Sequence, residues 1–599
     1  MPRRPVNPQY RQRVVRACDR CKSSKKRCDG KQPCKSCEKK GYEGVCHYTA
    51  GRRLHPLPRP ETLASQEDFD VRNAVTPDDI EPEFTADRQQ HGSQDINNHD
   101  TRESSMDTLG QPPVMLSSVS GEKVFVGNTA ALSFLRFIQK TLKRQVGPSY
   151  FTDAQDTQRL FEADAADTGS SRFYTALSID DQRTYIQYFL DASNGLLDLY
   201  SWDDVSKLLR NQSSRRSSVG QTSYPDFNDF ETASLYLMVA IGAQCCGPTK
   251  DAVSWAAGLF YHARQMAMKR MLEEPSLELV RVFLLMAFYM FGACRRNSAF
   301  MYLGVASKAA DILGLHMSAQ YRHLSPDIRR ARLRTAKSIR VFDVICNSIL
   351  GRPTSTPSLR PGHTSYVSDE TGVGSDIIYR AFALGATYEI AAILDIAVSK
   401  SADSAIDIDA AEDLVLALQQ RSRNFPSILR RQNGGEATSS RSVTIGNIHV
   451  SGAYYFSVIL VTRHFLIQHI VPQLSEEAHR APGNNTNSQP DSMEEAKTTQ
   501  LADACVEAAT FMAQMCHQVM KSGHLLGNMC ILKAWLFATG LVLGFSLLER
   551  NITNSSERRA AFVKSLHVLG ELKRLSPQAE QYYGILLNFH QAIKMYTEQ

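Results

Sequence analysis

Six cysteines near the N-terminus carry most of the chemistry that this sequence suggests. They are spaced C-x2-C-x6-C-x5-C-x2-C-x8-C, at Cys18, Cys21, Cys28, Cys34, Cys37 and Cys46. The short turn of a C-x2-C pair can bring both thiolates to one metal, as tetrahedral Zn²⁺ requires. Two zinc ions need eight ligand positions and only six thiolates are present, so two thiolates must bridge both ions. The array therefore predicts a binuclear cluster, with one bridging cysteine from each half.

A disulfide-stapled module is the alternative for six cysteines in so short a span. Residues 1–16 hold no apolar signal segment, and the array itself is dense in cations. The remaining cysteines are scattered, and the adjacent Cys245 and Cys246 lie in an apolar helical stretch that suits reduced thiols. The sequence therefore favours a metal cluster over disulfide bonds.

Positive charge is concentrated around the cysteines. Residues 1–60 contain 17 Lys and Arg against 4 Asp and Glu, a net charge of +13, whereas residues 61–599 carry −7. Charge of this density indicates a partner with a phosphate backbone. The cations between the second and third cysteines are Lys22, Lys25, Lys26 and Arg27. If this segment forms a short helix, its lysines lie on one face of that helix. The zinc ligands at either end of the segment would then fix the orientation of this face.

Residues 16–48 resemble the Zn₂Cys₆ binuclear-cluster domain of fungal transcription factors. The resemblance covers all six cysteines, the cations between the second and third, Asp29 and the loop proline Pro33. It implies two zinc ions bridged by Cys18 and Cys34. The implied ligand sets are Cys18, Cys21, Cys28 and Cys34 for one ion, and Cys18, Cys34, Cys37 and Cys46 for the other.

The same resemblance implies that the first short helix enters the major groove of double-stranded DNA over a CGG-type triplet. Lys25, four residues after the second cysteine, is then the base-contacting residue, because lysine commonly pairs with guanine. Lys22, Lys26 and Arg27 are candidates for phosphate contacts. Ser24 stands where some members have a second base-reading lysine, which leaves the exact triplet open.

We expect residues 1–15 to be a disordered basic tail and residues 49–120 to be a disordered linker. Alternating prolines after Gly51 prevent a continuing helix, and no heptad repeat follows them. A coiled-coil dimer is therefore not expected, and a monomer and a homodimer through the C-terminal body both stay open. The linker is polar and poor in aromatics, as disordered segments are. Its acidic segment 78–84 could serve in activation, although a solvated linker is the simpler interpretation.

Residues 121–599 are predicted to form a large all-α regulatory domain, because long apolar stretches recur there at helical spacing. Leu132, Leu135, Ile138 and Leu142 form one amphipathic stripe. At this length we expect two lobes. The expected helices are 129–145, 231–246, 252–272, 277–293, 299–313, 327–350, 376–399, 407–421, 451–473, 494–521, 525–549, 556–574 and 579–597, and the expected loops are 211–228, 432–446 and 475–493. No membrane span is expected, because the most apolar run, 534–548, is too short.

Residues 300–315 and 329–353 resemble the fungal-specific transcription factor domain, or middle homology region. An arginine cluster, Asp343 and the tripeptide Gly351-Arg352-Pro353 carry this resemblance, whereas the tryptophan pair usual in the family is missing. It implies a domain that restrains the activator and responds to inducers or partners. The simplest interpretation of Asp343 and Arg352 is a structural cap and an ion pair.

The common enzyme motifs for phosphate cradles, nucleophile elbows, zinc proteases and dinucleotides are absent from the sequence. Cys516, His517, His524 and Cys530 suggest a third zinc site, but their spacing fits no common zinc pattern. Their apolar surroundings favour core positions instead. We therefore expect a protein that is not an enzyme.

The combined interpretation is a nuclear, zinc-dependent regulator of RNA polymerase II transcription from a fungus. Its partners would be double-stranded DNA and the transcription machinery or co-regulators, with no membrane involved. A pathway-specific activator is the first expectation. The alternatives are a repressor or co-regulator of a metabolic gene cluster and, in a different class, a zinc-cluster RNA or structural nucleic-acid binder.

Overall fold

The computed structural model of the chain separates into two compact units, Met1–Asn98 and His99–Gln599, and each is considered by itself. The first unit is described at residues 18–24, 26–42, 44 and 46–47. The second is described at 113–118, 121–153, 177–217, 229–247, 250–273, 275–321, 323–357, 375–403, 405–426, 429, 440–474, 492–549 and 555–598. Lys25, the predicted tail 1–15 and the acidic segment 78–84 lie outside the described residues, as does most of the predicted linker.

The first unit contains two short helices, α1 (Asp19–Ser23) and α2 (Lys35–Glu38). Each begins directly after a cysteine, because Cys18 and Cys34 are extended N-cap residues. Cysteines also make up the buried cluster of this unit: five are buried and Cys28 is half-buried. Without an apolar core in its described part, this unit depends for stability on what its thiols bind.

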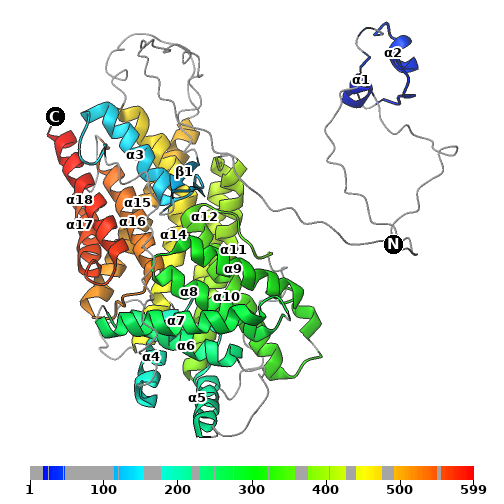
Figure 1. Cartoon of the computed structure of the whole chain (residues 1–599). Coiled ribbons are helices and arrows are strands. Elements are labelled where there is room, and N and C mark those ends of the chain that lie inside the picture. Colours follow the sequence, from blue (N-terminus) through cyan, green and yellow to red (C-terminus); the bar gives the residue numbers. More distant parts are fainter. Residues whose placement is uncertain are drawn as a thin grey trace, which may run out of the picture. The chain divides into compact units, whose positions relative to one another are not determined.

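The second unit is a helical body with one two-stranded hairpin (Figure 1). The hairpin pairs β1 (Val114–Ser117) with β2 (Lys123–Val126) in antiparallel register. The helices are α3 (Ala131–Val146), α4 (Ile179–Ser193), α5 (Trp202–Ser217), α6 (Asp229–Cys245), α7 (Lys250–Arg270), α8 (Leu277–Gly292), α9 (Arg296–Ile312), η5 (Ser318–Tyr321), α10 (Pro326–Leu350), α11 (Ser375–Asp403), α12 (Ile408–Arg423), α14 (Arg441–Leu474), α15 (Ser492–Lys521), α16 (Cys530–Ser546), α17 (Ser555–Leu572) and α18 (Pro577–Thr597).

Every stretch that was expected to be helical contains a helix, and the apolar stripe of α3 is buried as expected. The structure adds α4, α5 and the hairpin, which the sequence analysis did not identify. Strand β1 lies within the range assigned to the linker, so the folded body extends N-terminal to residue 121. Strands of four residues carry too little alternation to be recognised in a sequence.

Helices that follow one another in the chain lie side by side, as α6 does with α7, α8 with α9, and α14 with α15. Helix α11 contacts both α10 and α14, and the C-terminal helices α17 and α18 pack on α16 (Figure 1). The buried hydrophobic residues form one continuous cluster from Leu116 to Ile593. The expectation of two lobes is therefore wrong for the described residues, because the long central helices bury apolar surface on all sides.

The tripeptide Gly351-Arg352-Pro353 attaches the hairpin to the end of α10. Gly351 adopts a left-handed conformation (φ 63°) after the last turn of the helix, and the backbone N–H of Gly127 donates to the Leu350 carbonyl at 2.9 Å. Arg352 donates from Nε to the Phe125 carbonyl in β2 (3.2 Å). The tripeptide thus has a structural role in this fold.

Asp343 caps the loop after α10 and does not pair with Arg352. Its Oδ2 accepts from the backbone N–H of Ser355 (2.8 Å) and from the backbone N–H (2.7 Å) and hydroxyl (2.6 Å) of Thr356. Arg352 instead donates from Nη2 to Asn297 Oδ1 at 2.8 Å. The interpretation of Asp343 as a cap agrees with these contacts, whereas the ion pair between Asp343 and Arg352 is absent.

Two helical segments, Ile378–Ala402 and Arg441–Leu474, are long and apolar enough to cross a membrane by length and composition alone. In the folded body, 67% and 78% of their most apolar windows are buried. A helix that is apolar all round is also what the core of a large globular body contains. We therefore interpret both segments as core helices.

Candidate metal centre and nucleic-acid interface

The structure brings the six predicted metal ligands together in two overlapping groups. The Sγ atoms within each group all lie within 4.8 Å of one another, and the groups are Cys18, Cys21, Cys28 and Cys34, and Cys18, Cys34, Cys37 and Cys46. Cys18 and Cys34 belong to both groups. This is the arrangement that six thiolates require if they are to supply four ligands to each of two metals.

The sulfur separations fit tetrahedral zinc. Sγ of Cys34 lies 3.8 Å from that of Cys18 and 3.6 Å from that of Cys21, and Sγ of Cys18 lies 3.8 Å from that of Cys37. A tetrahedral ion with Zn–S bonds of about 2.3 Å would hold its sulfurs about 3.8 Å apart. A disulfide needs about 2.05 Å, and these cysteines are free thiols. The donor set therefore fits zinc and excludes disulfide pairing here.

Backbone N–H groups orient the thiols. The N–H of Cys21 donates to Sγ of Cys18 (3.4 Å), the N–H of Cys18 to Sγ of Cys28 (3.4 Å) and the N–H of Cys34 to Sγ of Cys46 (3.2 Å). Hydrogen bonds of this kind fix the direction of a ligand and stabilise its thiolate.

The loop between the halves is fixed by Asp29, the acidic residue that follows the third cysteine. Its two carboxylate oxygens accept from the backbone N–H groups of Lys31 and Lys35, both at 3.2 Å. These bonds lower the pKa of Asp29, against a smaller effect of burial. Asp29 thereby connects the end of the first half to the start of α2.

The pKa of each of the two shared cysteines is shifted downward. Burial raises the pKa of Cys34, but the backbone N–H of Cys37 and the neighbouring thiols outweigh it and lower the pKa to about 6. Burial opposes ionisation of Cys18 too, and the N–H of Cys21 shifts its pKa downward. By contrast, burial and the neighbouring thiols raise the pKa of Cys21 to about 12.

The described cations of the predicted DNA-contacting set are exposed. Lys22 lies on α1, and Lys26 and Arg27 follow it before Cys28. Lys40, which comes from the second half of the array, lies beside Lys26. Its side-chain hydrogen bond with Lys26 and its like charge lower the pKa of Lys26. Cations from both halves of the array thus lie on one surface. The position of Lys40 on this surface was not predicted from the sequence.

Arg20 is a second cation whose position the sequence analysis missed. Its guanidinium stacks over the ring of Tyr42 at 3.5 Å from the centroid, which joins α1 to the segment after α2. Ser24 donates from its hydroxyl to the Arg20 carbonyl at 2.5 Å and so closes α1. The signal in the sequence was an aromatic residue close to a cation-rich array.

Among the described side chains, which do not include that of Cys530, no third zinc site is formed. Cys516 is fully buried, and burial raises the pKa of its thiol to about 12. The ring of His517 lies 5.2 Å from that of His567, and no third ligand joins them among the described side chains. The burial of Cys516 agrees with the core position expected for it.

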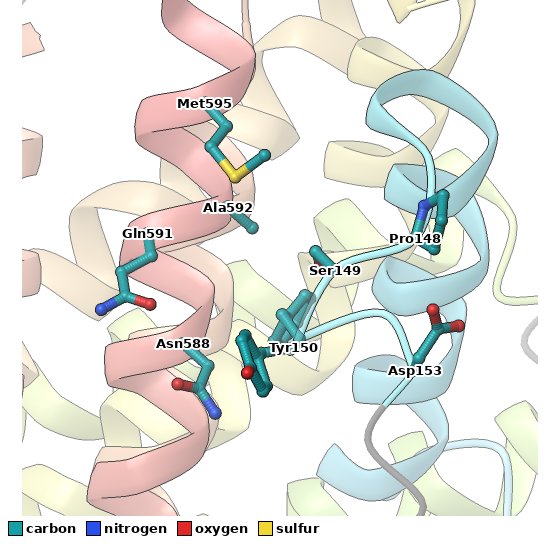
Figure 2. Close-up of a pocket in the computed structure, with 9 residues that line it drawn as sticks. Pro148, Ser149, Tyr150, Asp153, Asn588, Gln591, Ala592 and Met595 are labelled. Atoms are coloured by element: carbon teal, nitrogen blue, oxygen red, sulfur yellow. The ribbon is translucent and has the colours of Figure 1, made fainter.

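The body also has surface hollows. One of about 540 Å³ lies between the segment after α3 and helix α18 (Figure 2). The residues labelled there are Pro148, Ser149, Tyr150 and Asp153 on one side, and Asn588, Gln591, Ala592 and Met595 on the other. Asp153 is already paired with Lys143 at 2.5 Å. This hollow is therefore lined by aromatic side chains and two amides, but by no unpaired charge.

Comparison with known protein families agrees with this geometry. Residues 16–53 match the model of the fungal Zn(2)-Cys(6) binuclear cluster domain, and residues 186–363 match that of the fungal specific transcription factor domain. The chain is therefore similar to fungal Zn(2)-Cys(6) regulators both in its N-terminal cysteine array and in part of its helical body. The described residues between 18 and 47 lie within the first match. The second match begins inside α4 and includes α5 to α10.

Three curated relatives illustrate the similarity of this chain to transcriptional regulators. An uncharacterized transcriptional regulatory protein of Schizosaccharomyces pombe is 21% identical over 59% of this chain and 47% of its own length. Transcription factor FBD3 of Gibberella moniliformis is 24% identical over 58% of this chain and 53% of its own length. Protein RDR1 of Saccharomyces cerevisiae is 39% identical, over 12% of this chain and 13% of its own. The chain thus spans about half the length of two of these relatives.

Proposed function

We propose that this protein is a nuclear, sequence-specific DNA-binding regulator of RNA polymerase II transcription, and that it acts as a pathway-specific activator. Two zinc ions, bridged by Cys18 and Cys34, would hold the N-terminal domain together. Lys25 would contact guanine in a CGG-type triplet through the major groove, while Lys22, Lys26 and Arg27 would contact phosphates. The second unit would receive regulatory signals and contact co-regulators.

The overlap of the two cysteine groups is the observation that carries this proposal. Because Cys18 precedes α1 and Cys28 follows the cations, ligands of one metal would enclose the segment from residue 22 to residue 27 at both ends. A cationic segment held in this way loses little conformational freedom when it enters a groove. Exposed Lys22, Lys26 and Arg27 support a role in phosphate contact.

Binding of the zinc-loaded full chain to fluorescent duplexes tests the base contact. The Lys25→Ala variant should bind a CGG-type site and a scrambled site almost equally, because the side chain that distinguishes guanine is gone. The matched control is Lys31→Ala, which removes an exposed lysine from outside the segment between Cys21 and Cys28. The control should weaken binding to both duplexes alike and lower the salt dependence. Undiminished discrimination by the Lys25→Ala variant contradicts the assignment.

The nucleic-acid class is tested by competition between duplex DNA and RNA of the same sequence at fixed salt. A reader of the major groove should prefer B-form duplex strongly, because the major groove of A-form RNA is too narrow to admit side chains. Equal competition by RNA would favour the RNA-binding alternative. Light scattering of the full chain with one or two triplets determines whether a monomer or a homodimer binds.

Activation is tested separately by fusing residues 61–599 to an unrelated DNA-binding domain. Induction of a reporter gene would support an activator. Silencing of a reporter that has its own basal expression would support the repressor alternative instead. Because the fused segment lacks the zinc domain, this result is independent of the DNA-binding test.

A further inference from the structure

A cavity of about 450 Å³ lies inside the second unit, between the end of α4, the start of α5, helices α10 and α11, and the first turn of α14. Volumes of this size suit metabolites and other small organic ligands. Unlike the hollow of Figure 2, this cavity is lined by several charged side chains. The balance of those charges indicates what it can hold.

Two of the lining arginines share one buried carboxylate. Asp198 Oδ1 lies 2.7 Å from Arg334 Nη2 and 3.3 Å from Arg380 Nε, and Asp198 is 3% exposed. Burial alone would raise the pKa of Asp198, but the two guanidinium groups outweigh it and lower the pKa. Asp198 is therefore ionised, and the trio carries one net positive charge.

Arg441 adds a third cation, at the first residue of α14. Its guanidinium lies over the ring of Tyr188, 4.8 Å from the centroid. Its Nε is buried without a hydrogen-bond partner, and no ion pair within 4.0 Å involves Arg441 among the described residues. The N–H groups of the first helical turn add positive potential at the same place.

One further carboxylate, Asp191, lines the cavity. It accepts a hydrogen bond from Gln187 Nε2 at 2.9 Å. Burial raises its pKa, and Gln187, Arg441 and Arg380 offset part of this shift. With Asp191 ionised, the three arginines exceed the two aspartates by one charge. The cavity therefore has an excess of positive charge in either state of Asp191.

Apolar and aromatic groups form the remaining wall. Leu190 and Tyr200 are buried there, and Trp202 is 41% exposed, at the start of α5. A wall of this kind packs against the hydrocarbon part of a ligand, whereas the cations fix its charged end.

We propose that this cavity binds a small organic anion, with its carboxylate or phosphate at Arg441 and its apolar body against Trp202. The site lies in the second unit and goes beyond the proposed DNA binding. Such a ligand would link α4, α10, α11 and α14, and so stabilise the arrangement of these helices by binding the folded body. Carboxylate and phosphate share the chemistry that the cations recognise, and the experiment distinguishes them.

Titration of the full chain with 8-anilinonaphthalene-1-sulfonate, an aromatic monoanion, tests the site. The wild-type protein should bind this probe saturably, and Arg441→Gln should weaken binding about tenfold or more, because a charge-assisted contact is lost. The matched control is Arg421→Gln, which removes an exposed arginine of α12 from outside the cavity and should leave affinity unchanged. Benzoate and phenyl phosphate should compete with the probe, whereas neutral benzamide should not.

A second measurement locates the probe without relying on the stability of the Arg441→Gln variant. The chain has three tryptophans, Trp202, Trp255 and Trp535, of which Trp202 lines the cavity. The bound probe should quench tryptophan emission in the wild type, and Trp202→Phe should remove most of the quenching. Competition by benzoate alone identifies a carboxylate ligand, and competition by phenyl phosphate alone identifies a phosphate. Equal competition by benzamide, failure of both anions to compete, or unchanged quenching in Trp202→Phe overturns the proposal.

Discussion

The Sγ atoms of Cys18 and Cys34 lie 3.8 Å apart, and each of these two cysteines belongs to both metal-ligand groups. Their shared position couples the two halves of the N-terminal domain, since neither half can complete a set of four thiolates without them. The other four cysteines each belong to one group. Substituting a shared cysteine should therefore affect both metal positions, whereas substituting one of the other four should affect only one.

Zinc content should distinguish the shared cysteines from the others. We expect about two zinc ions per wild-type chain, almost none in Cys34→Ser, and about one in Cys46→Ser, because only the first substitution removes a ligand from both sets. Elemental analysis of the purified full chain measures this. Cys516→Ser, in the core of the body, is the control and should keep the wild-type content. Equal losses in the Cys34 and Cys46 variants would contradict the shared pair.

Gly351→Ala should destabilise the body by about 2–4 kcal/mol. A Cβ atom there would lie 2.8 Å from Gly127 Cα, and the backbone has φ +63°, so both contact and conformation oppose a side chain. Gly314→Ala is the matched control, because Gly314 has φ +65° and open space around it. It should lose only about 1 kcal/mol. Urea unfolding of both variants measures the difference, and equal losses would show that the contact with Gly127 is unimportant.

Asp198→Asn should lower the free energy of unfolding by about 3 kcal/mol, because it leaves two buried guanidinium groups without their carboxylate. The control is Asp180→Asn at the exposed pair with Arg183, which should change stability little. Thermal unfolding of the two variants tests this prediction. A small effect in the Asp198 variant would mean that the arginines find other partners in the cavity.

Acid stability should depend on His449, which is 1% exposed and donates from Nδ1 to the Asn194 carbonyl at 2.7 Å. Burial lowers the pKa of His449 from 6.5 to about 4. Between these values the unfolded chain binds a proton that the folded chain excludes, so stability falls as the pH drops from about 6.5 to 4. The loss from this group approaches about 3 kcal/mol.

Urea midpoints between pH 7 and pH 4 measure this slope. His449→Gln should flatten it, whereas the exposed control His323→Gln should leave it unchanged. An unchanged slope in His449→Gln would assign acid sensitivity to other groups.

The metal centre could be predicted from the sequence because its geometry is almost entirely local. All six cysteines lie between residues 18 and 46, and the count of thiolates alone required two shared ligands. Helix α3 could also be predicted, because the apolar stripe of Leu132, Leu135, Ile138 and Leu142 has the period of a helix. Helices α4 and α5 were missed because polar residues interrupt their apolar pattern.

The sequence by itself determined the cysteine spacing of the candidate metal centre, the separation of a basic head from a helical body, and most of the helices, because these depend on spacing within short segments. Only the tertiary structure decided what Gly351, Arg352 and Asp343 do, and that one core rather than two unites the body. The same holds for the cavity, where Asp198, Arg334 and Arg441 meet from distant positions in the chain. Contacts between residues so far apart follow from the packing of whole helices, which no local pattern encodes.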